Sequence, residues 1–409
     1  MEVWKRNLYV IWAAELVAIA GFSVVMPFLP YYVQELGITE LHQVEIWSGI
    51  LFATQAATMT IFAPIWGSVA DRYGRKLMVQ RAMFGGAVVL AIMGFAQNVW
   101  QLAILRAIQG MLTGTVPAAT TLVASSAPRE RSGYALGLLQ TAVWSGASVG
   151  PLLGGLVADT WGYRAAFWVT GSLLFVAGLT VWRFVEEDFH PPKRDAASPE
   201  SGFWYGVKLV ARDHGLISLF FVRILARLAV RTLGPILPLF VQSLIPASTR
   251  VASITGLISG AGAATSAVGA LTLGRASDRL GYRRVLLVCA LLAGLVYVPQ
   301  FFVQNPWQLL FLQGLLGLVM SGVLASISAL LANLAPEGRQ GAVYGVDSSA
   351  VAMANAIGPM LGASVAAAFG LRVPFLLAAV IFFLAAGLAW VAVPKPQPAT
   401  APVALEEAP

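Results

Sequence analysis

Repeated apolar stretches constrain the fold of this chain more than any other feature of its sequence. Each stretch is long enough to cross the hydrocarbon core of a bilayer as a helix, which takes about 20 apolar residues. Twelve of them lie at residues 8–33, 47–69, 77–97, 100–125, 133–158, 165–185, 215–242, 251–273, 284–303, 307–332, 341–368 and 371–393. Hydrophobic residues make up 58% of the chain and charged residues 11%, whereas about a quarter of a soluble domain is charged. The sequence therefore predicts an all-α membrane protein with twelve transmembrane helices.

The second half of the chain repeats the landmarks of the first half. The repeated landmarks are Trp100-Gln101-Leu102 with Trp307-Gln308-Leu309, Ala127-Pro128 with Ala335-Pro336, and Gly150-Pro151 with Gly358-Pro359. Their spacing is 207 or 208 residues, and chance rarely keeps one register over so many turn residues. We therefore expect two pseudo-symmetric six-helix bundles, at residues 1–186 and 215–394.

Two segments lie outside these bundles. Residues 187–214 begin with charges and prolines, which is typical of a linker. The end of this linker, from Phe203 to Arg212, mixes aromatic and basic side chains, which predicts a short helix at the membrane surface. Residues 395–409 are rich in Pro and Ala, and this composition predicts a disordered tail.

The positions of Lys and Arg predict the orientation in the membrane. Most of these residues lie in the loops on the side of the N-terminus, whereas the opposite loops carry only Arg164, Arg250 and Arg372. Cytoplasmic loops are enriched in Lys and Arg. Both termini are therefore expected in the cytoplasm.

Several classes of protein are excluded at this point. The single cysteine, Cys289, rules out a disulfide framework within one chain and a metal site built from several thiolates. The sequence has no phosphate-binding loop and no nucleophile motif in a suitable context, so we expect neither an enzyme nor an ATP-driven pump. The net charge is +7, and the residues that carry it lie in short loops between spans, which argues against a nucleic-acid partner. We expect no metal and no organic cofactor.

A charged turn separates the second and third apolar stretches. It reads Gly67-x-x-x-Asp71-Arg72-x-Gly74-Arg75-Lys76, and its counterpart in the second copy contains Gly274, Asp278 and Arg279. Carboxylate and arginine side chains at helix ends favour charge-assisted contacts. We expect this turn to act as a latch that closes one membrane face in one conformation. The alternative is that its charges only fix the orientation.

The fifth stretch carries a row of small residues. Gly146, Gly150 and Gly154 recur every four residues, next to Pro151 and Gly155. Such a row lets helices approach closely, and the proline removes a backbone donor and bends the helix. In the second copy Ala363 stands where the first has Gly155, so we expect looser packing there.

These motifs together resemble those of the major facilitator superfamily, in particular its bacterial twelve-helix drug/proton antiporters. The charged turn is similar to the signature loop of the superfamily, and the glycine row to a motif of the exporters. Arg106-x-x-Gln109-Gly110 and Pro27-Phe28-Leu29-Pro30 resemble two further motifs. The resemblance implies two bundles that rock around a central cavity in a bacterial inner membrane, driven by a proton gradient.

Ionisable residues inside the apolar stretches are the candidate site. They are Glu15, Arg106, Arg223, Arg227, Arg231 and Asp347. A charge at mid-membrane costs about 2.5–3.5 kcal/mol on insertion scales, so each is expected to face a cavity or a partner. Glu15, Asp347 and Arg106 are the candidates for proton coupling. Alternatively, either carboxylate only neutralises an arginine, and Arg106 is structural.

Further candidates for the cavity wall are Gln109 and Phe22. If all six ionisable groups face one cavity, its formal charge is +2 with both acids ionised. This charge predicts a preference for anionic or zwitterionic amphiphiles, because arginine forks favour carboxylate and phosphate.

The function predicted from these features is proton-coupled export of small amphipathic compounds by a monomer surrounded by membrane lipids. One alternative is a transporter of an anionic or zwitterionic metabolite or of a lysolipid, with the same fold. A second alternative is a sensor or scaffold that transports nothing. A latch and buried carboxylates favour transport, because a scaffold has no use for either.

Overall fold

The computed structural model describes residues 2–128, 131–187, 189, 203–246, 250–336 and 339–393, which form helices and their connections. The N-terminal half contains α1 Val3–Val25, the 3-10 turn η1 Met26–Phe28, α2 Leu29–Glu35, α3 Leu41–Tyr73, α4 Arg75–Met93, α5 Val99–Leu112, α6 Thr115–Ser126, α7 Ser132–Trp161 and α8 Tyr163–Phe184. The C-terminal half contains α9 Phe203–Arg212, α10 His214–Thr232, α11 Ile236–Ser243, α12 Val251–Leu280, α13 Tyr282–Phe301, α14 Pro306–Leu334, α15 Gln340–Phe369 and α16 Val373–Ala392. The tail at 395–409 lies outside the described residues.

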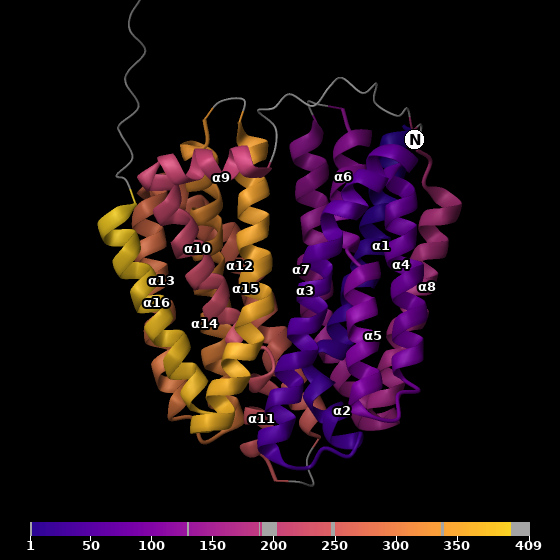
Figure 1. The fold of residues 1–409 in the computed structure, drawn as a ribbon, viewed down its shortest axis with the longest axis vertical. Coiled ribbons are helices and arrows are strands. Elements are labelled where there is room, and N and C mark those ends of the chain that lie inside the picture. The colour runs from indigo at the N-terminus through magenta and orange to yellow at the C-terminus, as the bar shows by residue number, and fades with distance from the viewer. Residues whose placement is uncertain are drawn as a thin grey trace, which may run out of the picture.

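The helices confirm the all-α membrane fold. Eleven helical segments of the described part are long and apolar enough to cross a bilayer. The remaining predicted span, 215–242, is built by α10 and α11, and α10 differs in composition because it carries three arginines. Its 19 residues extend about 28 Å at 1.5 Å per residue, and α11 continues the span to the distal face (Figure 1).

Three of the predicted spans are broken rather than continuous. The first breaks at Pro27, the fourth at Gly114 and the seventh before Pro235. Proline removes a helix donor and disturbs the preceding turn. Gly114 has a φ of +129°, which is a conformation that other residues rarely adopt. The sequence pattern predicted the spans but not where Gly114 interrupts one.

We name two opposite faces of the molecule after the elements that lie on them (Figure 1). The terminal face carries the N-terminal end of α1, the helix α9 and the C-terminal end of α16. The distal face carries α2 and α11. Each half has its own buried apolar core, and α9 packs against α10 and α15 of its own half.

The two halves meet through α7 against α12 and through α3 against α15. Near the distal face these pairs are too close for side chains. A Cβ on Gly256 would lie 2.1 Å from the Pro151 carbonyl oxygen, and one on Gly155 would lie 2.6 Å from the Ala252 oxygen. A Cβ on Gly49 would lie 2.5 Å from that of Ala363. Glycine therefore permits this contact between the halves.

The glycine row of α7 packs within its own half. A Cβ on Gly150 would lie 2.4 Å from the Ala20 oxygen of α1, and Cβ atoms on Gly146 and Gly154 would lie 2.8 and 2.3 Å from backbone oxygens of the same helix. The looser packing expected at Ala363 is not found. Gly49 on the partner helix leaves the space that Ala363 needs, so the glycine of this contact lies on α3 rather than on α15.

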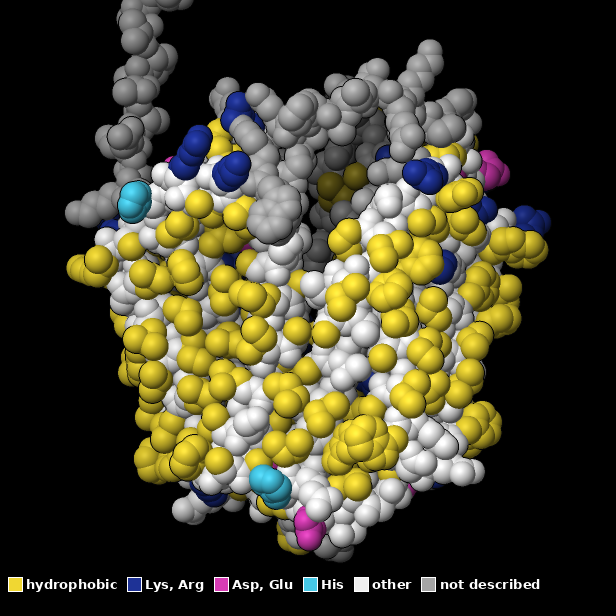
Figure 2. All heavy atoms as spheres, viewed as in Figure 1, with side chains coloured by type: hydrophobic (Ala, Val, Ile, Leu, Met, Phe, Trp, Pro, Cys, Tyr) yellow, Lys and Arg dark blue, Asp and Glu magenta, His cyan; other side chains and the backbone are white. Residues whose placement is uncertain are grey.

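The same four helices stand apart near the terminal face. Glycines at their terminal ends, namely Gly67, Gly137, Gly274 and Gly345, have no neighbouring atom within 4 Å of a Cβ position. Figure 2 shows a hollow between the halves at this end. The structure is therefore closed at the distal face and open at the terminal face.

This geometry predicts opposite effects of alanine at two glycines of α12. Gly256→Ala should destabilise the protein by about 1–3 kcal/mol, because overpacking forces the backbone of α7 to shift. Gly274→Ala should be neutral or stabilise by up to about 1 kcal/mol, because alanine favours a helix more than glycine does. Thermal unfolding of the purified variants tests this, and equal melting temperatures would contradict the close contact at the distal face.

Candidate substrate cavity and gates

Three arginines occupy one face of α10 because they recur every four residues. The first of them, Arg223, forms an ion pair with Asp347 of α15, with Nε 2.6 Å from Oδ1. Both side chains are nearly buried, at 12% and 8% exposure. One alternative from the sequence was that a carboxylate only neutralises an arginine, and the structure places Asp347 in this position beside Arg223. The charges of this pair compensate each other.

Arg227 and Arg231 line a cavity of about 460 Å³ among α10, α12, α13 and α14. The side chain of Arg231 is exposed although Ala229 and Thr232 beside it are fully buried, so its exposed surface faces the cavity. Its Nε donates to Asn355 Oδ1 at 2.7 Å. Neither arginine forms an ion pair with a carboxylate in the part of the chain that the structure describes. The cavity therefore has a cationic wall.

Glu15 lies in a different environment. It is fully buried in the N-terminal half, where Oε1 accepts a hydrogen bond of 3.1 Å from the Thr115 hydroxyl. Its other oxygen, Oε2, has no partner among the described residues. A negative charge at this position would have no ion-pair partner in the part of the chain that the structure describes, and an uncompensated buried charge is costly. Glu15 and Asp347 are therefore not equivalent.

Arg106 does not face the open cavity. It is fully buried, with Nε donating to the Leu51 carbonyl at 3.3 Å and Nη1 donating to Gln109 Oε1 at 2.7 Å. The bond to Leu51 ties α5 to α3, whereas the bond to Gln109 lies within α5. Gln109 is consequently buried as well, and Phe22 has its ring beside Gly86 of α4. The six ionisable groups thus do not share one cavity. The lining of the 460 Å³ cavity carries a formal charge of +2, from Arg227 and Arg231.

The charged turn contacts its own half in this conformation. Gly74 has a φ of +98° and separates α3 from α4. The Glu187 carboxylate accepts hydrogen bonds from the backbone N–H groups of Arg75 at 2.9 Å and of Lys76 at 2.7 Å. An acidic group is favourable at a helix N-terminus, so the start of the linker is held against α4. The side chain of Asp71 lies outside the described residues, and Arg72 is exposed.

The counterpart of this turn in the second copy is similar in shape. Gly281 has a φ of +90° between α12 and α13. The Tyr282 hydroxyl donates to Asp278 Oδ1 at 2.8 Å. Gly274 has open space beside it, and Arg279 lies in the last turn of α12.

Polar contacts join the two halves at the distal face. The Tyr31 hydroxyl donates to the Pro238 carbonyl at 2.6 Å and lies 2.8 Å from Thr255 Oγ1. The side-chain amides of Gln34 and Gln242 pair with each other at 2.8 and 3.0 Å. These contacts close the route between the halves.

Asp159 makes a further contact of this kind. Its carboxylate, at the end of α7, accepts hydrogen bonds from the backbone N–H groups of Ala252 at 3.3 Å and Ser253 at 2.7 Å. These groups belong to the first turn of α12 in the other half, where a helix has unpaired donors and favours an anion. Asp159 therefore holds the N-terminus of α12 against α7.

Our sequence interpretation did not identify Asp159, although a signal for it exists. Gly155-x-Val157-Ala158-Asp159-x-x-Gly162 repeats Gly67-x-Val69-Ala70-Asp71-x-x-Gly74 at a spacing of 88 residues. The comparison of the two halves used a spacing of 207 or 208 residues and so missed this repeat within one half. Gly162 also has a positive φ, of 84°, as Gly74 does. The two turns thus share their backbone geometry on opposite faces.

Removing the Asp159 carboxylate should loosen the distal face. Asp159→Ala deletes a helix cap, which is worth about 1–2 kcal/mol, and thereby favours distal opening by about 5–30-fold. Opening can be measured as the alkylation rate of Ala252→Cys by a membrane-impermeant maleimide in a Cys289→Ser background. Glu35→Ala is a matched control, since Glu35 pairs with Arg164 at 3.1 Å within one half. An unchanged alkylation rate in Asp159→Ala would show that this carboxylate does not hold the distal face closed.

The sequence is similar to those of known proteins along nearly its whole length. The family model described as Major Facilitator Superfamily matches residues 11–219 and again residues 219–408. The chain is 38% identical over 390 residues to the multidrug resistance protein MdtG of Dickeya zeae (strain Ech586), which covers 95% of this chain and 94% of that protein. It is 37% identical over 396 residues to MdtG of Proteus mirabilis (strain HI4320), covering 96% and 97%.

Solved structures share the fold. A bacterial homolog of the human lysosomal transporter Spinster, in an inward-facing and occupied conformation, has a TM-score of 0.80 at 16% identity, with 96% of this chain and 97% of that chain covered. The human organic anion transporter MFSD10 has a TM-score of 0.65 at 19% identity, with 95% and 100% covered. Because the family model matches both halves and the relatives align over nearly the whole length, the chain belongs to the major facilitator superfamily and is a secondary transporter, not an enzyme.

Proposed function

We propose that this transporter exports small amphipathic compounds from the bacterial cytoplasm in exchange for protons. Two relatives that align over nearly the whole chain are named multidrug resistance proteins. Most Lys and Arg residues of the loops lie at the terminal face, which supports a cytoplasmic terminal face. In this orientation the open side of the cavity takes up substrate from the cytoplasm.

The proton is proposed to bind to Glu15. The observation that carries this assignment is the environment of its carboxyl group, which has one hydrogen bond from Thr115 and no cation beside it in the described part of the chain. A proton carrier must gain and lose its charge during each cycle. Asp347 is less suited because the guanidinium of Arg223 compensates its charge. Arg106 is assigned a structural role between α3 and α5.

Alternating access is proposed to exchange one pair of helix caps for another. In the present conformation Asp159 caps α12 at the distal face. When the distal face opens, these bonds break, and the halves approach at the terminal face. Asp71 occupies the equivalent position at the end of α3, and α15 is the partner helix of α3. We propose that Asp71 then caps the N-terminus of α15, with Arg72, Arg75 and Lys76 around it.

A second candidate is the transport of anionic or zwitterionic amphiphiles with the same mechanism. Arg227 and Arg231 favour it, because they line the cavity without a carboxylate partner in the described residues. Guanidinium groups bind carboxylate and phosphate through paired hydrogen bonds. The same cavity also offers the ring of Tyr297 and the side chains of Leu237 and Met320 to an apolar group.

Glu15→Gln should abolish transport driven by a pH gradient, because glutamine cannot exchange a proton. Substrate exchange without a gradient should continue, since the cavity is unchanged. Efflux and counterflow from proteoliposomes measure the two activities separately. Asp347→Asn is the comparison variant. It should lower the free energy of unfolding by about 3 kcal/mol, because it leaves Arg223 unpaired. Accumulation by Glu15→Gln that still follows the pH gradient would assign the proton elsewhere.

Substrate charge should depend on the two unpaired arginines. Arg227→Gln and Arg231→Gln should each weaken the binding of an anionic amphiphile about tenfold, the effect of losing about 1.4 kcal/mol of charge-assisted hydrogen bonding. Binding of a cationic amphiphile with the same apolar group should weaken less or improve. Titration of the purified protein measures both ligands, with Arg183→Gln at the exposed end of α8 as control. Preference of the unmodified protein for the cation would contradict the anionic substrate class.

A further inference from the structure

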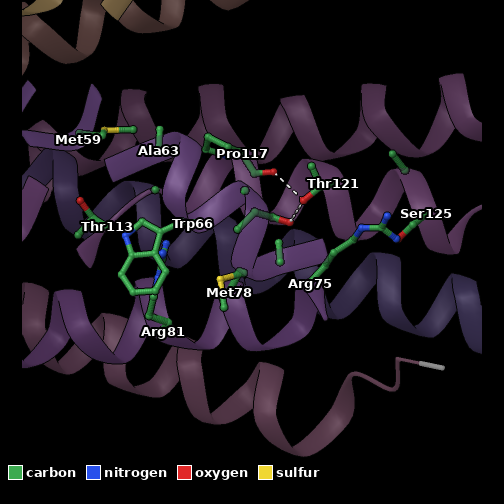
Figure 3. Close-up of a pocket in the computed structure, with 15 residues that line it drawn as sticks. Met59, Ala63, Trp66, Arg75, Met78, Arg81, Thr113, Pro117, Thr121 and Ser125 are labelled. Carbon is green, nitrogen blue, oxygen red and sulfur yellow. Dashed lines mark hydrogen bonds between the residues drawn. The ribbon is translucent and has the colours of Figure 1, made fainter. Parts of the chain in front are cut away.

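A second cavity, of about 610 Å³, lies within the N-terminal half. Its walls come from the terminal end of α3, the first turns of α4 and the helix α6, and α10 and its arginines take no part in it (Figure 3). Met59, Trp66 and Met78 give it apolar surface, and Arg75 and Arg81 give it positive charge. None of its lining residues is acidic. The proposed transport cycle uses Arg75 of the charged turn, which also lines this cavity, but assigns no ligand to the cavity.

Arg81 is held in place with part of its hydrogen-bonding capacity unused. Its guanidinium carbon lies 3.9 Å from the centre of the Trp66 ring, and Trp66 Nε1 donates to the Met111 carbonyl at 2.6 Å. This bond fixes the ring and therefore the guanidinium stacked on it. Arg81 Nε and Nη1 are buried and have no partner in the described part of the chain. Buried donors without a partner favour the binding of an anion.

The two arginines lie at different depths of the cavity, and the rest of its lining is uncharged. Arg75 begins α4 at the terminal face, and Arg81 follows six residues later, about 9 Å deeper at 1.5 Å per residue. Ala63, Pro117 and Thr121 are exposed between α3 and α6 and carry no charge. A ligand with an anionic group and an apolar chain matches this arrangement, because the chain can leave between these small side chains.

We propose that this cavity binds an anionic phospholipid from the membrane leaflet at the terminal face. The phosphate binds Arg81, Arg75 adds positive charge nearer the terminal face, and an acyl chain follows Trp66 and Met59 toward the opening between α3 and α6 (Figure 3). A lipid fits better than a soluble anion because the opening is uncharged and the arginines lie near the end of the helices, where head groups are found. The bound lipid also contacts Gly67 and Arg75 of the charged turn.

Lipid binding to the purified full-length protein in neutral detergent tests this proposal without any transport assay. Dioleoyl phosphatidylglycerol should bind at least about tenfold more tightly than dioleoyl phosphatidylcholine, as native mass spectrometry and thermal shifts would show. Arg81→Gln should abolish this difference. Ala63→Phe should weaken the binding by filling the opening while both arginines remain. Arg183→Gln, which removes an exposed arginine at the terminal end of α8, should have no effect.

Three results would overturn the proposal. Equal binding of both lipids, or phosphatidylglycerol binding that survives both Arg81→Gln and Ala63→Phe, would show that the cavity is not the site. Binding of dodecyl phosphate, a single-chain anion, tests whether the cavity takes a soluble amphiphile rather than a membrane lipid. If it binds in an Arg81-dependent manner while phosphatidylglycerol does not bind, the cavity accepts single-chain anions and the assignment to a membrane lipid is wrong.

Discussion

The close contact between α7 and α12 at the distal face is the constraint on which the rest of the structure depends. Gly256 and Gly155 remove the side chains that would keep the two backbones apart, and Asp159 then reaches the first turn of α12. Glycine supplies close approach, and the carboxylate supplies a specific polar contact. Because each half has its own apolar core, the halves can separate here without unfolding. Closure at one face leaves the cavity open at the other.

The distribution of charge inside the membrane follows from this arrangement. Arg223 and Asp347 neutralise each other within the C-terminal half, while Arg227 and Arg231 remain on the cavity wall. Glu15 is buried in the N-terminal half, with a hydrogen bond from Thr115 and no ion pair among the described residues. Coupling in our account therefore links a proton site in one half to an anion-binding wall in the other. Rocking of the halves changes the access of both from one side of the membrane to the other.

Much of the fold could be predicted from the sequence, because apolar length and an internal repeat are local features of the chain. The burial of Glu15 followed from its place within an apolar stretch. The partner of Arg223 could not be predicted, because it depends on how α10 and α15 align after packing. The enclosure of Arg106 by Leu51 and Gln109 depends on the packing of α3 against α5. The space for Ala363 is provided by Gly49, which lies far from it in the sequence. A comparison of equivalent positions in the two copies does not connect these residues.

Distances between spin labels on the two halves test the central claim of alternating closure most directly. One pair, at Leu41 and Phe369, reports on the distal face, and another, at Tyr134 and Leu280, reports on the terminal face; all four side chains are exposed. Distances would be measured by double electron–electron resonance at acidic and alkaline pH, with and without a transported amphiphile. Our account predicts that the Leu41–Phe369 distance lengthens in the same conditions that shorten the Tyr134–Leu280 distance. Distances that change in the same direction, or that never change, would contradict it.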